Sequence, residues 1–194
     1  IGRRPNTAGL FGEGFAVDME RGRILVDESF QTSVPGVYAV GDVSSKIQLA
    51  HVAAAQGAAC VERLAGREPL VDVALVPSCI YTSPEIASIG ITADEAKTAG
   101  RAVKVGKALM SANGKTVIAA GERGFIKIVA DASTGVVLGA QLMCERATDM
   151  LSELTEAVVN GLTAQQLARV MRPHPTFDEA VSAAVEDLLE KLEK

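Results

Sequence analysis

The apolar positions in the first 70 residues predict one strand, loop and helix unit. The segments "RILVD" (23–27) and "VYAV" (37–40) are short apolar runs bounded by turn residues, which is typical of strands. Residues 49–64 are rich in Ala and Leu and predict a helix, with Gly66 where a C-terminal cap belongs. A buried strand followed by a loop and a helix indicates part of an α/β domain.

The pattern changes near residue 70, between Pro69 and Pro77, and we place a domain boundary there. After it, a helix is expected to begin at Thr92, because Glu95 follows at the spacing of a capping box. The Ser-Thr-Gly turn within 132–135 should join two of the strands. The strand-like segments are 78–82, 86–91, 101–109, 124–131 and 135–144, and we expect the last three to form an antiparallel meander.

Three helices are predicted at the end of the chain, at 148–160, 163–170 and 176–192. The last has an apolar face at 3.6-residue spacing, made of Phe177, Val181, Val185, Leu188 and Leu189. Its other face, which should point to solvent, carries Glu186, Asp187, Glu190, Lys191 and Lys194. Residues 71–194 are therefore predicted to be an α+β domain, an antiparallel sheet with flanking helices.

Composition and charge narrow the class of protein. The apolar fraction is 48%, which favours a compact globular chain over a disordered one. The net charge is −5 and the basic residues are scattered, so nucleic acid is not an expected partner. Apolar runs end well before the roughly 20 residues that a membrane span needs. We expect a cytoplasmic protein with reduced thiols.

The three cysteines, Cys60, Cys79 and Cys144, are far apart in the sequence. Their number is odd, and they fit no Cys-x-x-Cys or Cys/His ligand pattern. We therefore predict buried structural thiols and no metal site.

His174 lies between Pro173 and Pro175 in "RPHPTFDEA", so the imidazole is held on a rigid extended bend just before a helix. Two readings of Glu179 stay open. It can cap the helix together with Thr176, or it can bind one ring nitrogen of His174 and leave the other as a proton acceptor. In the second case the pair would serve as a general base near neutral pH, and both roles can coexist.

A second candidate site follows the predicted strand at 37–40. Asp42 would lie at the carboxyl edge of a sheet, where open α/β folds bind ligands, although an ordinary Gly-Asp turn explains it equally well. The helix that begins near Gln48 would point its free N–H groups at the same space. His51, in the first turn, is either a ligand contact or a polar surface residue.

Five motifs in order carry a resemblance that covers the whole chain. They are "IGRRPN", "GVYAVGDV", "LAHVAAAQG", "YTSPEIASIG" and "HPTFDE". The set resembles the C-terminal half of the pyridine nucleotide-disulfide oxidoreductases, nearest to the dihydrolipoamide dehydrogenases. The resemblance implies the end of an NAD-binding domain and an incomplete FAD-contacting segment in 1–70, followed by a dimerisation domain in 71–194.

In that family a flavin takes electrons from a dithiol through a redox-active cysteine pair and passes them to a pyridine nucleotide. The resemblance implies FAD and NAD as cofactors, a homodimer, and dihydrolipoamide or a lipoyl-bearing protein as substrate. His174 then looks like the acid/base, with Glu179 as its orienting partner. The implied cofactor-binding residues are Asp42, Gln48, Leu49, Ala50, His51 and Gly2.

Parts of the family pattern are missing or altered. The 194 residues contain neither the G-x-G-x-x-G flavin fingerprint nor the C-x-x-x-x-C redox pair, so the chain alone is predicted to be inactive. Arg172 stands where many lipoamide enzymes have a second histidine, and Phe177-Asp178 replaces the commoner Leu-Ser. A non-catalytic dimerisation or scaffolding module from the same family is the alternative. The first 70 residues are predicted to be the less ordered part, because their core is small.

Overall fold

The computed structural model describes residues 2–121 and 123–194. The chain divides into two compact units, of which the first ends at Ala74 and the second begins at Leu75. This division falls a few residues after the boundary predicted near residue 70.

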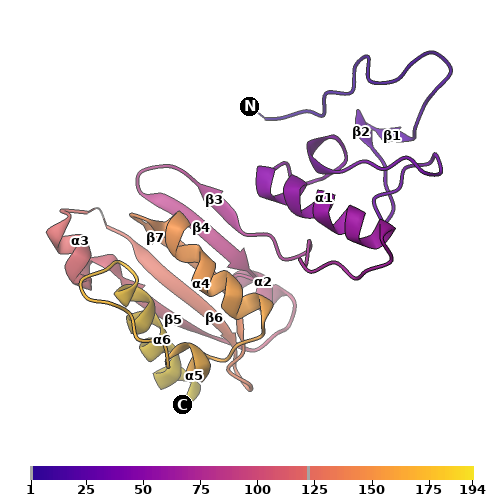
Figure 1. Ribbon diagram of the computed structural model, residues 1–194. Coiled ribbons are helices and arrows are strands. Elements are labelled where there is room, and N and C mark those ends of the chain that lie inside the picture. The colour runs from indigo at the N-terminus through magenta and orange to yellow at the C-terminus, as the bar shows by residue number, and fades with distance from the viewer. Residues whose placement is uncertain (1, 122) are drawn as a thin grey trace. The chain divides into compact units, whose positions relative to one another are not determined.

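The second unit is built on a five-stranded antiparallel sheet, which confirms the predicted fold class (Figure 1). Its last three strands form the predicted meander, and the last of them then pairs with β4, so that the strand order is β3-β4-β7-β6-β5. The strands are β3 (Ser78–Ile80), β4 (Glu85–Gly90), β5 (Val103–Leu109), β6 (Phe125–Asp131) and β7 (Val137–Cys144).

The helices predicted for the second unit are present, but two differ from their predicted bounds, and the short helix α3 was not predicted. The last helix begins at Glu179 and not at residue 176, because the Thr176 hydroxyl donates to the Pro173 carbonyl and does not cap the helix. The helix predicted at 163–170 is a single turn. The helices are α2 (Ala93–Thr98), α3 (Gly114–Ile118), α4 (Ala147–Val159), α5 (Ala164–Leu167) and α6 (Glu179–Leu192), with a 3₁₀ turn at Met110–Ala112. The capping box at Thr92 and Glu95 is present as predicted.

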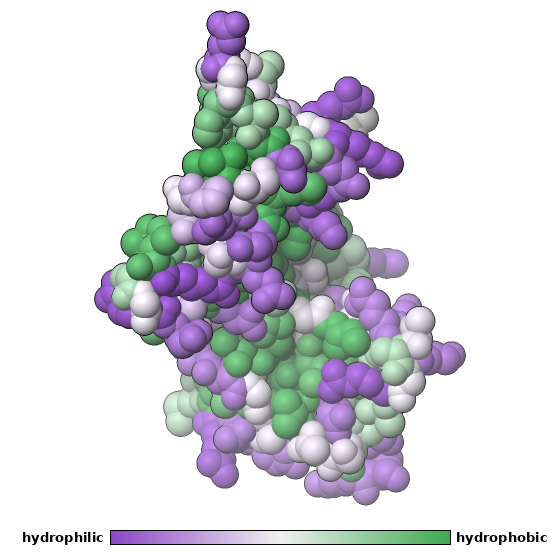
Figure 2. Space-filling view, turned by 90° about the vertical axis from the view of Figure 1, so that its right-hand side faces the viewer, coloured by the Kyte–Doolittle hydropathy of each residue, from purple (hydrophilic) through white to green (hydrophobic). Residues whose placement is uncertain are grey.

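The two faces of the sheet differ in how far helices cover them. One cross-strand row is buried under α4 and α6, and it consists of Ala108, Ile126, Leu142 and Ala87. The neighbouring row, on the opposite face, consists of Leu109, Phe125, Met143, Ile86 and Ile80. Leu109, Ile86 and Ile80 in that row stay exposed. Figure 2 shows that apolar areas interrupt the polar surface on one side of the molecule.

Helix α6 packs on β5 and β6 through the predicted apolar face, of which Val181, Val185 and Leu188 are buried and Leu189 is partly buried. Phe177, which precedes the helix, is buried as well. Two polar residues of α6 were predicted wrongly, because Asp187 and Lys191 are only partly exposed. The Asp187 carboxylate accepts from the Lys107 backbone N–H at 2.7 Å, and the Lys191 ammonium donates to the Val105 carbonyl at 2.9 Å. They bind the edge strand β5, whose outer backbone groups would otherwise lack partners.

The first unit contains β1 (Met19–Glu20), β2 (Arg23–Ile24), a 3₁₀ turn at Gly41–Val43 and α1 (Ala50–Leu64). The predicted helix is confirmed, and Gly66 closes it in a left-handed conformation (φ 71°) with its N–H bound to the Arg63 carbonyl. The strand predicted at 37–40 is absent. Tyr38 forms only an isolated bridge with Gln31, and a strand needs a longer ladder of partners than this segment finds.

Across the described ranges, no helix is both long and apolar enough to cross a membrane.

Candidate functional site

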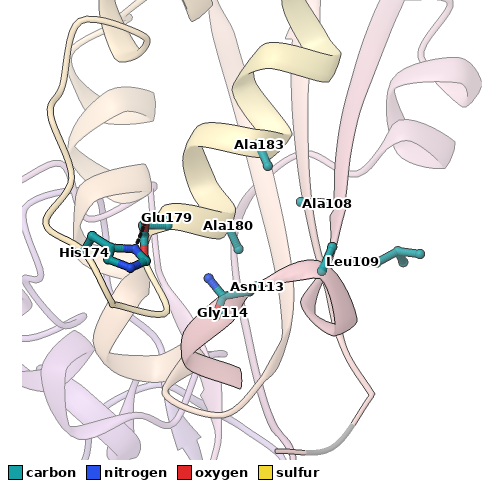
Figure 3. A pocket seen from close by; sticks show the side chains of 9 residues that line it. Ala108, Leu109, Asn113, Gly114, His174, Glu179, Ala180 and Ala183 are labelled. Atoms are coloured by element: carbon teal, nitrogen blue, oxygen red, sulfur yellow. Dashed lines mark hydrogen bonds and ion pairs between the residues drawn. The ribbon is translucent and has the colours of Figure 1, made fainter. Parts of the chain in front are cut away.

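The loop before α6 presents the His174 side chain outward. The ring is 77% exposed, and its Nδ1 lies 2.9 Å from Glu179 Oε1 (Figure 3). Pro173 and Pro175 fix the backbone on both sides, while Glu179 is held on the first turn of a helix that is packed on the sheet. The backbone that carries the two residues is therefore held in place, while the imidazole of His174 is open to solvent.

Glu179 binds two groups at once, but it does not cap the helix together with Thr176, because α6 begins only at Glu179 and has no side-chain cap. Its Oε1 faces the imidazole, and its Oε2 accepts from the Thr176 backbone N–H at 2.9 Å. The Thr176 N–H bond first, and then the His174 hydrogen bond, lower the pKa of Glu179 below its ordinary value. The carboxylate is thus ionised near neutral pH and can only accept hydrogen bonds, so the ring proton between them belongs to Nδ1. Nε2 of the neutral ring is left as the proton acceptor.

A cavity of about 160 Å³ lies beside this pair. Its polar side chains are His174, Glu179 and Asn113, and the rest of its wall is small or apolar (Figure 3). The other lining residues are Ala108, Leu109, Ala112, Gly114, Ala180 and Ala183. Such a cavity suits an apolar group that carries an exchangeable proton at one end.

The buried side chain of Arg172 anchors the loop that carries His174, and the sequence did not indicate this role. Its side chain is 4% exposed and forms an ion pair with Glu153 of α4. It also donates to the Ser182 hydroxyl of α6 at 2.8 Å. The residue two positions before His174 is therefore bound to two helices. Because Glu153 lies 19 positions away in the sequence, no local pattern could have revealed this pair.

Asn113 is the second residue that sequence reasoning missed. It is the N-cap of α3 and also donates a hydrogen bond to the His174 loop at the Thr176 carbonyl. Asn followed by Gly-Lys-Thr is a capping signal, so the cap was readable from the sequence, whereas the bond to the loop was not.

In the first unit, the structure brings together Asp42 and most of the stretch from Gln48 to His51. Asp42 is exposed in the 3₁₀ turn, and Gln48 Nε2 donates to its carbonyl oxygen at 3.2 Å. Leu49 is the N-cap of α1 and has no side chain that could cap it, while Ala50 and His51 are exposed in the first turn. An exposed carboxylate and a helix N-terminus without a side-chain cap therefore lie close together.

Gly2 is exposed, and a Cβ placed on it would meet nothing within 4 Å. The adjacent Arg3 donates to the Gln48 carbonyl at 2.6 Å, which ties this segment to the start of α1.

The thiols show the character of buried structural groups in two of three cases. Cys60 and Cys144 are buried, whereas Cys79 is partly exposed. Burial raises the pKa of the Cys144 thiol to about 12, and it raises the pKa of Cys79 as well. Both thiols are therefore protonated at neutral pH and poorly nucleophilic. Within 2–121 and 123–194, no cluster of three or more His, Cys, Asp or Glu side chains could hold a metal ion.

Proteins of known type resemble this chain over most of its length. The Bacillus subtilis dihydrolipoyl dehydrogenase is 44% identical over 185 residues, which are 95% of this chain and 39% of the relative. The Trypanosoma brucei dihydrolipoyl dehydrogenase is 42% identical over 186 residues, again 95% of this chain and 39% of the relative. The chain thus spans about two fifths of the length of these relatives.

Two solved structures share the fold. The crystal structure of LpdA from Mycobacterium tuberculosis superposes with a TM-score of 0.85 at 29% identity, covering 94% of this chain and 40% of that one. The HOCl-induced flavoprotein disulfide reductase RclA from Escherichia coli gives a TM-score of 0.83 at 26% identity, covering 97% and 43%.

Family profiles match both units. The profile described as "Pyridine nucleotide-disulphide oxidoreductase, dimerisation domain" matches residues 76–185, and that described as "Pyridine nucleotide-disulphide oxidoreductase" matches residues 1–57. Since the first of these covers more than half of the chain and agrees with the antiparallel sheet and its helices, the chain belongs to the pyridine nucleotide-disulphide oxidoreductase family.

Proposed function

We propose that this chain supplies the acid–base pair and the dimerisation part of a flavin-dependent dihydrolipoyl dehydrogenase. The proposed enzyme oxidises dihydrolipoyl groups and reduces NAD. The observation that carries the proposal is the exposed His174 ring, with Nδ1 held 2.9 Å from the Glu179 carboxylate. The relatives at 42 to 44% identity, which are named dihydrolipoyl dehydrogenases, support the substrate class.

The part of the reaction that this chain performs is proton transfer. His174 accepts the proton of a substrate thiol at Nε2, because Nδ1 already donates to Glu179. The Glu179 carboxylate stabilises the imidazolium that forms and keeps the ring from rotating. Since the ring is mostly exposed, a dithiol from another molecule can reach Nε2. The imidazolium then releases this proton to solvent, so that the neutral ring can accept a proton from the next substrate thiol.

A bound flavin would supply the electron-accepting chemistry, and the first unit has residues that fit it. The exposed Asp42 carboxylate can accept hydrogen bonds from flavin hydroxyl groups, and the α1 N-terminus beside it favours partial negative charge. We propose Asp42 together with Gln48, Leu49, Ala50, His51 and Gly2 as the cofactor contacts of this chain. FAD and NAD are the proposed cofactors.

We propose that the enzyme is a homodimer whose interface includes residues of the second unit. The match to a dimerisation domain supports this. The exposed apolar residues on the uncovered sheet face, such as Leu109, Ile86 and Ile80, are surface that a partner would cover favourably. Dihydrolipoamide, free or on a lipoyl-bearing protein, is the proposed substrate, and the cytoplasmic location remains a prediction.

The direct test is the reduction of NAD by dihydrolipoamide, followed at the absorbance of NADH. The complete enzyme, with its redox cysteines and flavin, should catalyse it, and the 194-residue chain alone should not. Reduced glutathione in place of dihydrolipoamide is the control for substrate class. Turnover with glutathione but not with dihydrolipoamide would refute the proposed substrate, and turnover by the chain alone would refute the division of roles.

A dimerisation or scaffolding module is the second candidate, and one observation favours it. The three cysteines of the chain lack the C-x-x-x-x-C spacing of a redox pair. The coding sequence that precedes Ile1 distinguishes the two candidates. Codons for a flavin fingerprint and a redox cysteine pair in the same reading frame would support the enzyme, and an initiation site near Ile1 would support the scaffold.

A further inference from the structure

Asn113 connects the start of α3 with the loop that carries His174. Its side chain is buried, and the whole residue is 6% exposed. Oδ1 accepts from the Thr116 backbone N–H at 2.9 Å and from the Thr116 hydroxyl at 3.0 Å, which caps α3. Nδ2 donates to the Thr176 carbonyl at 3.0 Å, across 63 positions of sequence. One amide group thus serves as a helix cap on one side and as a donor to the loop on the other.

The two peptide groups that flank Thr176 Cα join Asn113 to the acid–base pair. The Thr176 carbonyl is bound by Asn113, and the Thr176 N–H is bound by Glu179 Oε2 at 2.9 Å. The other oxygen of Glu179 faces His174 Nδ1 at 2.9 Å. The contacts therefore run without a gap from Asn113 through Thr176 and Glu179 to the imidazole. Asn113, Glu179 and His174 all line the cavity (Figure 3).

We propose that Asn113 is a positioning residue for His174, which acts by fixing the Thr176 carbonyl and, through the Thr176 backbone, the N–H from which Glu179 takes its orientation. The effect on turnover rests on the proposed function, whereas the effect on the imidazole does not. The residue must accept on one side and donate on the other, and the Asn amide does so from two separate atoms without a charge. The Thr176 N–H is also the largest cause of the lowered pKa of Glu179, so movement of this peptide would reach the carboxylate directly.

Two variants separate the loop contact from the cap. In Asn113→Asp one carboxylate oxygen still caps α3. The second oxygen replaces the Nδ2 donor and faces the Thr176 carbonyl oxygen, which is also an acceptor, so the two oxygens repel each other. In Asn113→Ser the hydroxyl still caps, but it is too short to reach the loop and brings no charge. Thr116→Val is the matched control, because it removes a hydrogen bond on the capping side alone.

The first readout is the position of the ring proton, measured from the ¹⁵N shifts of the imidazole in the 194-residue chain. The chain has only two histidines, and the signals that vanish in His174→Gln belong to His174. In the neutral ring of the wild type and of Thr116→Val, Nδ1 should be protonated. Both Asn113 variants should give averaged shifts that indicate a mixture of tautomers.

Three outcomes would overturn the proposal. These are wild-type shifts in both Asn113 variants, an equal change in Thr116→Val, and loss of the folded circular dichroism spectrum in both Asn113 variants. The last would mean that Asn113 supports the fold as a whole. If only Asn113→Asp unfolds, the imidazole ¹⁵N shifts of Asn113→Ser alone test the proposal.

The second readout is the kinetics of the complete enzyme. Both Asn113 variants should lower kcat for dihydrolipoamide on the order of 10-fold to 100-fold, as expected for a misplaced catalytic group, with an unchanged KM for NAD. Thr116→Val should stay near the wild type. A change in the tautomer without a change in kcat would count against the proposed role of His174, while unchanged ring shifts would count against the role of Asn113.

Discussion

The two oxygens of Glu179 are bound by different partners, one backbone amide and one imidazole. The contact with the backbone amide and the contact with the imidazole therefore use the same carboxylate without competing. The amide makes the orientation of the carboxylate independent of the imidazole. His174 can thus gain and lose a proton while its partner stays in place.

This arrangement predicts how the pKa of Glu179 responds to loss of the ring. In His174→Ala the pKa of Glu179 should rise toward the ordinary value of 4.5 but stay below it, because the Thr176 N–H, the larger cause of the lowering, remains. A pH titration of the Glu179 side-chain carboxyl by ¹³C NMR measures this. A pKa that does not move, or one that returns fully to 4.5, would contradict the assignment of the two oxygens.

The sequence predicted the contact between His174 and Glu179 but not the residues that support it, and the reason is sequence distance. His174 and Glu179 are five positions apart, and the prolines on both sides of His174 and the helix that begins at Glu179 restrict the backbone conformation of this segment. The partners of Asn113 and Arg172 lie 63 and 19 positions away. Such contacts depend on how α3, α4 and α6 pack, which no local pattern contains.

Among the elements, the strands of the second unit were predictable because each finds a neighbour within the same unit. The segment 37–40 was not, because its apolar run resembles a strand while Tyr38 pairs only with Gln31. The polar face of α6 shows a similar limit. Asp187 and Lys191 follow the pattern of solvent-facing residues, but they bind backbone groups of β5.

Close packing of α6 on β5 predicts a cost for any side chain at Gly106. A Cβ there would clash with the Ala184 carbonyl oxygen and lie 2.9 Å from the Leu188 backbone nitrogen. We expect Gly106→Ala to lower the free energy of unfolding by about 1–3 kcal/mol, as overpacking does. Gly114→Ala is the control, because its Cβ meets nothing within 4 Å. Urea unfolding of both variants measures the difference, and equal stability would show that α6 is free to move away.

The hairpin between β6 and β7 predicts a dependence of stability on pH. Hydrogen bonds from Ser133 and Thr134 lower the pKa of Asp131 below its ordinary value of 3.8. A carboxyl with a lowered folded pKa stabilises the fold above the unfolded pKa, and this contribution is lost as the pH falls from 3.8 toward the folded pKa. Asp131→Ala should therefore lower Tm at pH 7, and the difference from the wild type should shrink below pH 3.8. A constant difference in Tm from pH 7 to pH 2 would contradict this cause.

For the whole molecule, the division at Ala74 and Leu75 separates two parts with very different cores. The core of the second unit is one continuous cluster that includes α4, α6 and the covered face of the sheet. The first unit has two small clusters, one around Val17, Ile24 and Ala39 and one around Phe30, Ala59 and Cys60. The dihydrolipoyl dehydrogenases that resemble the whole chain are much longer than the chain, which covers 39% of each of them.

We therefore predict that residues 2–70 exchange their backbone amides faster than β4, β6 and β7 in the 194-residue chain. A small core offsets less of the conformational entropy, so local opening costs less free energy. Hydrogen–deuterium exchange followed by mass spectrometry of peptides measures this, and α1 is the most informative element because, with 15 residues, it is the longest regular element described in the first unit. Exchange as slow in α1 as in β6 would show that the first unit is stable on its own.

The most direct test of the proposed role of His174 is the rate at which dihydrolipoamide reduces the enzyme-bound flavin, measured by stopped-flow absorbance in the complete enzyme. In His174→Gln this rate should fall on the order of 100-fold to 10,000-fold, the usual cost of losing general acid–base help, while flavin content and dimer mass stay as in the wild type. Flavin reduction at the wild-type rate in a folded, flavin-loaded His174→Gln dimer would contradict it.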